Sequence, residues 1–192
     1  METTLTEEKT IHERARKSLL WVAMISMVMV FGGLTSAYVV CTDRKDWVFF
    51  ELPRLFYIST AFILMSSVTM NWAISSVKKN NLKNVKQATL LTLLLGAAFI
   101  ISQFQAWKVL YNENIVFAGN QSSIAGSFLY VLTGLHMAHL IGGILAVLVV
   151  WVKSLREMYT SENYIGLTLC AIFWHFLDLL WIYLFLFLLF VR

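Results

Sequence analysis

Charged residues are scarce in this chain of 192 residues. Asp, Glu, Lys and Arg together make up 14% of it, whereas about 25% is usual in soluble domains. Hydrophobic residues make up 59%, and the mean hydropathy is +0.71. The core of a soluble domain cannot bury this much apolar surface, so the composition indicates a membrane protein. Proline occurs once, at Pro53, which argues against a loop-rich chain.

Cysteine is also rare, and only Cys41 and Cys170 are present. The membrane spans predicted below place them near opposite faces of the membrane. A disulfide needs Cα atoms within about 7 Å of each other, so these two cannot pair within one chain. No CxxC or CxxCH motif occurs, which excludes the usual thiol-redox, zinc and covalent-haem motifs.

Five apolar stretches are long enough to cross the membrane as helices. A helix needs about 20 apolar residues to cross roughly 30 Å of hydrocarbon. We therefore predict an all-α integral membrane protein, a bundle of five transmembrane helices in residues 18–192 that follows a tail of residues 1–17. No inverted pair of broken segments, the usual sign of a secondary transporter, is present. The predicted helices cover residues 18–40, 55–77, 88–107, 128–152 and 165–190.

The positive charges are distributed unevenly over the two sides of this predicted bundle. Ten Lys and Arg residues lie on the side of the N-terminal tail, and five lie on the other side. The positive-inside rule therefore places the N-terminus in the cytoplasm and the C-terminus in the periplasm. This bias accounts for the net charge of +4, so no nucleic-acid partner is expected. The apolar run after the tail exceeds the roughly 7 to 15 residues of a signal-peptide core, so we expect a retained tail.

Small residues recur at four-residue spacing in the first and fourth predicted helices. Gly32 precedes Ser36 by four residues, and Gly142 precedes Ala146 in the same way. Such pairs let membrane helices approach closely. We therefore assign a helix-packing role to Gly32, Gly33, Gly142 and Gly143.

Four ionisable residues are expected at membrane depth, where such groups are costly and usually face the bundle interior. His136 and His139 are three residues apart in the fourth predicted helix, and His175 and Asp178 are three apart in the fifth. Each pair therefore lies on one helix face. A rise of about 1.5 Å per residue places His139 level with His175, and His136 level with Asp178. If these helices are neighbours, the four side chains can form one polar cluster.

Several roles remain open for such a cluster. A hydrogen-bonded cluster that joins two helices is the simplest, because buried polar groups need partners. A lipid-headgroup or water site, a proton relay and a bound metal are alternatives. A haem held by the two histidines of the fourth helix is disfavoured, because bis-histidine haem needs ligands from opposite sides of its ring. No arrangement of nucleophile and base and no nucleotide motif occurs, so these residues predict a scaffold without chemistry of its own.

Two motifs carry a resemblance to a known family. Residues 133–143 read TGxHxxHxxxG, and residues 174–181 read WHFxDxxW. The chain resembles subunit III of the haem-copper terminal oxidases, in the short five-helix form found in many bacteria. Weaker similarity extends over the first three predicted helices, whereas the N-terminal tail lies outside it.

The resemblance implies an accessory subunit of a proton-pumping oxygen reductase in the bacterial inner membrane, with cytochrome c oxidase favoured. It implies no cofactor or metal on this chain, and places haem and copper on partner subunits. The partners would be subunit I in direct contact, subunit II, a small subunit IV and, as a further candidate, a larger respiratory supercomplex. Family members are credited with stabilising the catalytic subunit, holding phospholipids and supporting proton uptake. His136, His139, His175 and Asp178 would then have a structural role, and no residue a catalytic one.

Two positions depart from the family pattern. Met27 and Ala106 stand where family members often have glutamates, so any role of those carboxylates in proton handling or oxygen access is not expected here. Subunit III of a quinol oxidase is the closest alternative, since the electron donor is decided by other subunits. A small transporter and an independent metal- or haem-binding membrane protein are more distant alternatives.

Overall fold

The computed structural model describes residues 2–43, 47, 52–117 and 123–191, and within these residues the regular structure is helical throughout. Five helices are long and apolar enough to cross a membrane, which confirms the predicted all-helical membrane fold. Their bounds are α1 Glu2–Cys41, α2 Leu55–Lys78, α3 Leu82–Asn112, α4 Ile124–Leu155 and α5 Ile165–Phe190.

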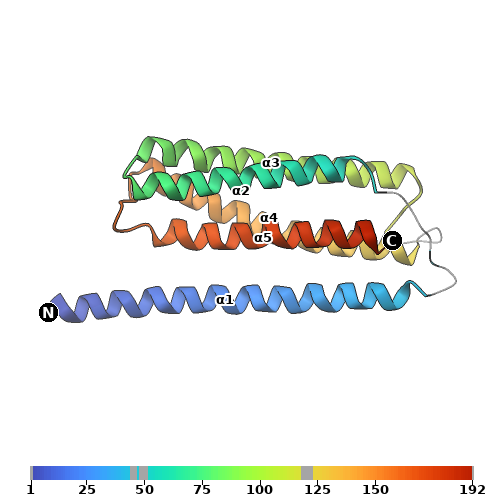
Figure 1. Cartoon of the computed structure of the whole chain (residues 1–192), viewed down its shortest axis with the longest axis horizontal. Coiled ribbons are helices and arrows are strands. Elements are labelled where there is room, and N and C mark those ends of the chain that lie inside the picture. The colour runs from blue at the N-terminus through green and yellow to red at the C-terminus, as the bar shows by residue number, and fades with distance from the viewer. Residues whose placement is uncertain (1, 44–46, 48–51, 118–122, 192) are drawn as a thin grey trace.

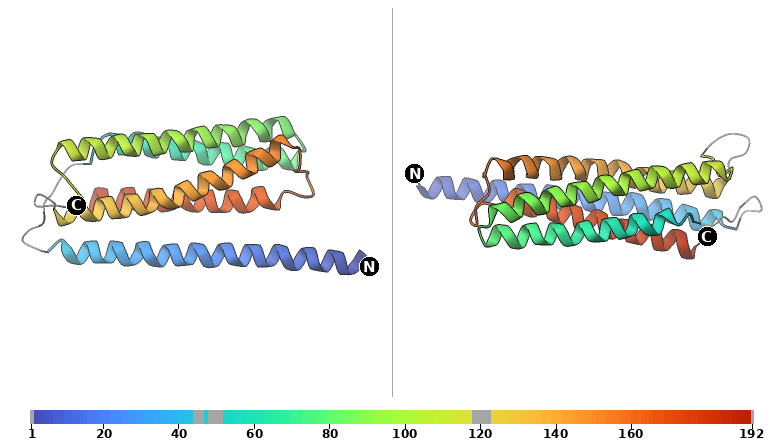
Figure 2. Two further views of the ribbon diagram at one scale, coloured as in Figure 1. Left: turned by 180° about the vertical axis from the view of Figure 1, so that it is seen from behind. Right: turned by 90° about the horizontal axis from the view of Figure 1, so that it is seen from above.

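Helices α2 to α5 form a bundle, and α1 lies along one side of it (Figure 1). Neighbours in the sequence run antiparallel, and α1 contacts the bundle through α4 and α5 (Figures 1 and 2). Helix α1 buries a single stripe of residues spaced by three, four or seven positions, as expected of a helix packed on one side only. The stripe consists of Met24, Phe31, Thr35 and Tyr38.

The helices extend beyond the predicted apolar stretches. Helix α1 starts at Glu2 and so includes residues predicted as a tail, although its membrane-compatible part begins at Glu13. Helix α3 starts after Asn81, whose side chain accepts a hydrogen bond from the N–H group of Asn84. Helix α4 starts after Ser123, whose side chain accepts a hydrogen bond from the N–H group of Gly126. Such caps define where helices begin, whereas an apolar-length criterion locates only the part that lies in hydrocarbon.

Two tryptophans of α5 form the centre of the bundle. Trp174 is fully buried and donates its indole N–H to Ser66 of α2, 3.0 Å away. Glycines leave the space for its ring, because a Cβ atom at Gly96 of α3 would lie 2.8 Å from the ring and one at Gly143 of α4 would lie 3.4 Å from it. One side chain of α5 therefore contacts each of the other three helices of the bundle.

Trp181 forms a second layer, two turns further along α5. Its ring stacks on Phe56 of α2, meets Phe99 of α3 edge-on at 4.9 Å between centroids, and lies 5.2 Å from the ring of His136 of α4. Its indole N–H donates to the hydroxyl of Thr60, 3.0 Å away. The two layers fix the height of all four bundle helices relative to one another.

Candidate functional site

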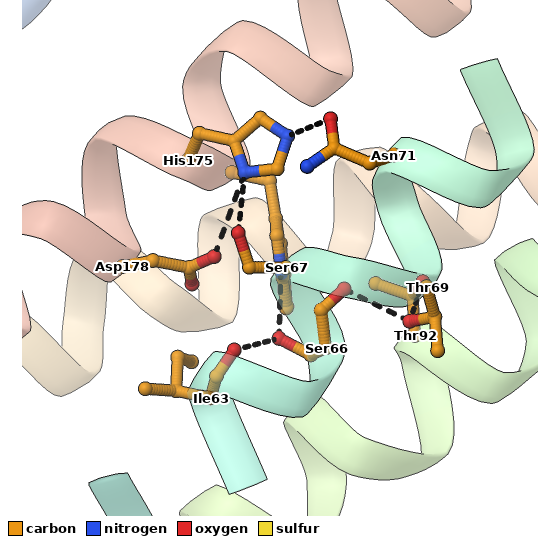
Figure 3. A network of polar contacts seen from close by, with 9 residues as sticks. Ile63, Ser66, Ser67, Thr69, Asn71, Thr92, His175 and Asp178 are labelled. Atoms are coloured by element: carbon orange, nitrogen blue, oxygen red, sulfur yellow. Dashed lines mark hydrogen bonds and ion pairs between the residues drawn. The ribbon is translucent and has the colours of Figure 1, made fainter. Parts of the chain in front are cut away.

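His175 joins α5 to α2 by two hydrogen bonds (Figure 3). Its Nδ1 lies 2.7 Å from the hydroxyl of Ser67, and its Nε2 lies 3.2 Å from Oδ1 of Asn71. An amide oxygen only accepts, so Nε2 carries a proton and donates it. In the neutral ring, Nδ1 then accepts the hydrogen bond from Ser67. Both partners come from one face of α2, four residues apart, so the ring lies across a single turn of that helix.

Asp178 lies beneath this histidine and is buried. Its Oδ2 is 3.8 Å from Nδ1 of His175 (Figure 3). Neither carboxylate oxygen has a hydrogen-bond partner among the described residues. The ring of His175 is the group with which this carboxyl group can pair. Such a partner suits an acidic side chain inside a membrane span.

His136 has a different environment in the interior of the bundle. It is fully buried between the aromatic rings of Phe99 and Trp181. Neither ring nitrogen has a hydrogen-bond partner among the described residues. Gln103 of α3 is also buried, and its amide donates to Ser59 of α2 at 2.7 Å. His136 therefore contributes ring packing to the Trp181 layer.

His139 is one turn from His136 but faces α1. Its Nδ1 lies 2.8 Å from the carbonyl oxygen of Leu135, in its own helix, and donates a hydrogen bond to it. Its ring centroid is 5.8 Å from that of Phe31 of α1. His139 thus takes part in the contact between α1 and α4.

The structure does not bring the four predicted residues together in one cluster. His175 and Asp178 lie together against α2, whereas no hydrogen bond within the described ranges joins them to the histidines of α4. His136 is opposite Trp181, about one turn beyond the level of Asp178 that the depth estimate gave it. That estimate counted from predicted helix ends, whereas the observed register follows from the tryptophan layers. The structural role of the four residues stays a prediction.

The four predicted packing glycines also differ from one another. A Cβ atom added to Gly143 would lie 2.8 Å from Leu177, so this glycine allows α4 and α5 to approach closely. A Cβ atom at Gly32, Gly33 or Gly142 would have no atom of the described residues within 4 Å, apart from its chain neighbours and the backbone of its own helix. Any packing role of these three would therefore involve atoms outside the described part of the chain.

Hydroxyl groups of α2 are the participants that the sequence analysis missed. Ser66, Ser67 and Thr60 bond to three side chains of α5, and Thr69 lies 2.7 Å from Thr92 of α3, hydroxyl to hydroxyl (Figure 3). The sequence feature that could have indicated these hydroxyl contacts is the high frequency of Ser and Thr in the stretch STAFILMSSVTM of α2. The hydroxyls of Ser66 and Thr60 donate to carbonyl oxygens of α2 itself and accept from the tryptophan N–H groups of α5, so they join the two helices.

The described residues contain no group of three or more His, Cys, Asp or Glu side chains placed to hold a metal ion. Of the four predicted residues, His175 is the one whose ring nitrogens form hydrogen bonds to another helix within the described ranges. The prediction that this chain carries no cofactor stays a prediction.

Comparison with known proteins agrees with this arrangement. The family model described as "Cytochrome c oxidase subunit III" matches residues 46–191. "Cytochrome c oxidase subunit 3" of Thermostichus vulcanus is 28% identical over 86% of this chain and 82% of its own length, and that of Corynebacterium diphtheriae is 30% identical over the same shares.

An animal relative matches over a smaller part of its own length. "Cytochrome c oxidase subunit 3" of Loxodonta africana is 34% identical over 71% of this chain and 49% of its own length. The chain thus spans about half the length of the animal relatives it matches. The family match includes α2 to α5, with both tryptophan layers and the contact of His175 with α2. This chain therefore belongs to the cytochrome c oxidase subunit III family.

Proposed function

We propose that this protein is a non-redox accessory subunit of a proton-pumping haem-copper oxygen reductase, of the cytochrome c oxidase type. The observation that carries the proposal is the use of the polar residues at membrane depth. Within the described ranges, His175, Ser66 and Ser67 join helices to one another and leave no constellation typical of a reaction site. A rigid bundle of this kind suits a subunit that stabilises a catalytic partner.

The proposal assigns the chemistry to other chains. Subunit I would be the direct partner and would carry the haem and copper of the oxygen-reducing centre, beside subunit II and a small subunit IV. Relatives named as cytochrome c oxidase subunits support cytochrome c over quinol as the electron donor of the complex. Bound phospholipid, support of proton uptake and membership of a supercomplex belong to the same proposal.

The proposed location is the bacterial inner membrane, with the N-terminus in the cytoplasm. Ten of the fifteen Lys and Arg residues lie on the N-terminal side of the bundle, as the positive-inside rule requires of the cytoplasmic side. A reporter enzyme that is active only in the periplasm should be active when fused after residue 192 and inactive when fused after residue 79. The reverse pattern would overturn this orientation.

Deletion of the gene for this chain tests the proposed function. We expect membranes without it to keep the haem bands of the oxidase, because the haem would be bound by other subunits. Oxygen uptake should begin and then decline faster during turnover than in wild-type membranes, and a plasmid copy should restore its duration. Loss of the haem bands from a complex that is otherwise assembled would contradict the non-redox role.

His175→Leu tests the structural role proposed for the contact between α2 and α5. The change removes the hydrogen bonds to Ser67 and Asn71 and the ring nitrogen that lies 3.8 Å from Oδ2 of Asp178. Hydrogen bonds between membrane helices contribute about 0.6 kcal/mol each on average, so we expect a loss of roughly 1 to 3 kcal/mol once the isolated acid is included. The thermal midpoint of the complex should fall while its haem spectrum stays unchanged. Altered haem bands would instead indicate a ligand role.

A further inference from the structure

A polar notch interrupts the outward face along which α2 and α5 meet. We define this seam notch as Ser67, Asn71 and His175 (Figure 3). Asn71 is exposed, and about a third of the His175 side chain is exposed. Counting about 1.5 Å per residue, Asn71 lies roughly 10 Å from the end of α2 at Lys78, and His175 roughly 15 Å from the start of α5. Both depths are within the hydrocarbon of a membrane about 30 Å thick.

The seam notch has hydrogen-bonding capacity that the described part of the chain does not use. The amide oxygen of Asn71 accepts from His175, but its amide nitrogen donates to no atom of the described residues. The two N–H groups of this exposed amide are therefore available to a partner beyond the described residues. Acyl chains accept no hydrogen bonds, and an unpaired polar group in hydrocarbon is costly.

Apolar side chains surround the seam notch on the same face. Val68 is 68% exposed and adjoins Ser67 in the sequence, and Leu64 and Leu179 are exposed on either side. The outward faces of α3 and α4 present the exposed apolar residues Leu94, Ile101, Ile141 and Leu145. The seam therefore combines an apolar surface with a central hydrogen-bond donor, which is the composition of a helix-packing surface and differs from that of a lipid-facing one.

We propose that the α2–α5 seam is the docking face for a membrane-spanning helix of the catalytic partner subunit, and that this helix presents a hydrogen-bond acceptor to Asn71. The proposal rests on the proposed function. The acceptor is an oxygen of a hydroxyl, amide or backbone carbonyl, since these groups form hydrogen bonds between membrane helices. The surrounding Val68, Leu64 and Leu179 supply the packing surface for that helix.

Site-specific photocrosslinking in native membranes tests the seam directly. A photoreactive residue replaces Val68 on the seam, and separate control variants carry it at Leu94 of α3 and Leu145 of α4, which are 56% and 57% exposed. We expect the probe at position 68 to form a polypeptide adduct with the haem-containing subunit, in at least tenfold excess over both controls. Adducts of that subunit with the α3 or α4 probe, but not with the seam probe, would overturn the proposal.

The outcomes of this experiment distinguish a wrong docking face from a wrong proposed function. If the tagged chain co-purifies with a haem-containing subunit but position 68 captures only lipid, the docking face is wrong and the accessory role stands. If no haem-containing subunit co-purifies and no probe captures one, the proposed function fails, and the docking proposal fails with it.

A second measurement tests the hydrogen bond itself. Asn71→Leu removes the amide donors, and Ser26→Leu is the matched control, since it replaces an exposed serine of α1 whose hydroxyl donates to Val22 of the same helix. Measured energies of hydrogen bonds between membrane helices correspond to roughly a 3-fold to 10-fold change in an equilibrium constant. We expect the solubilised complex to lose the Asn71→Leu chain faster by that factor and to retain the Ser26→Leu chain as it does the wild type. Equal retention of the two variants would overturn the role of Asn71.

Discussion

Replacing Trp174 with alanine should unfold the bundle at a much lower temperature than the wild type. The indole ring is fully buried against Gly96 of α3 and Gly143 of α4, and its N–H donates to Ser66 of α2. Loss of a buried tryptophan side chain typically costs about 3 to 5 kcal/mol, because a cavity remains where the ring was. For a chain of this size the thermal midpoint should fall by roughly 6 to 20 °C.

Trp72→Ala is the matched control for this measurement. Trp72 lies in the C-terminal part of α2 and is 41% exposed, so its removal leaves a much smaller cavity or none. We expect its thermal midpoint to remain within a few degrees of the wild type, measured in the same detergent. Equal shifts for the two variants would contradict the central position assigned to Trp174.

Adjacent glycines in α4 should respond very differently to the same substitution. In Gly143→Val, the first added carbon would lie 2.8 Å from Leu177, and the ring of Trp174 would limit the space for its two methyl groups. Overpacking of this kind costs about 1 to 3 kcal/mol. In Gly142→Val, the added carbon would have no atom of another described helix within 4 Å, so stability should change by about 0.5 kcal/mol or less.

The pair of valine variants is best compared by thermal unfolding of the purified chain in one detergent. A partner subunit would complicate the comparison, because Gly142 faces outward and is available for contacts in a complex. We expect only Gly143→Val to lower the midpoint clearly. A larger loss for Gly142→Val would mean that α4 is rotated relative to the arrangement described above.

The membrane fold could be predicted from the sequence because its main signal is local. Hydrocarbon of fixed thickness demands long apolar runs, and each run is visible without knowledge of its neighbours. The helix ends were less predictable, because Asn81 and Ser123 define them by hydrogen bonds in polar segments outside the apolar runs. Hydropathy also gave no indication that α1 begins at Glu2 and so includes residues expected to form a tail.

The candidate site was predictable only in part, because its geometry depends on helix rotation and register. The sequence indicated that His175 and Asp178 share a face, and they do lie together. It gave no means of placing Ser67 and Asn71 opposite them, since a contact between α2 and α5 spans over a hundred residues of chain. Which glycine of the adjacent pair in α4 faces α5 likewise depends on the rotation of that helix, which the tryptophan layers set.

The central claim is that this chain is a colourless accessory subunit of a haem-copper oxidase. Its most direct test is purification in mild detergent through a tag on this chain, with a reduced-minus-oxidised spectrum and mass identification of the proteins that co-purify. We predict that a large haem-containing subunit co-purifies with the chain, and that the chain alone, once separated, absorbs no visible light. Purification without such a partner, or haem bands that stay with the isolated chain, would contradict this account.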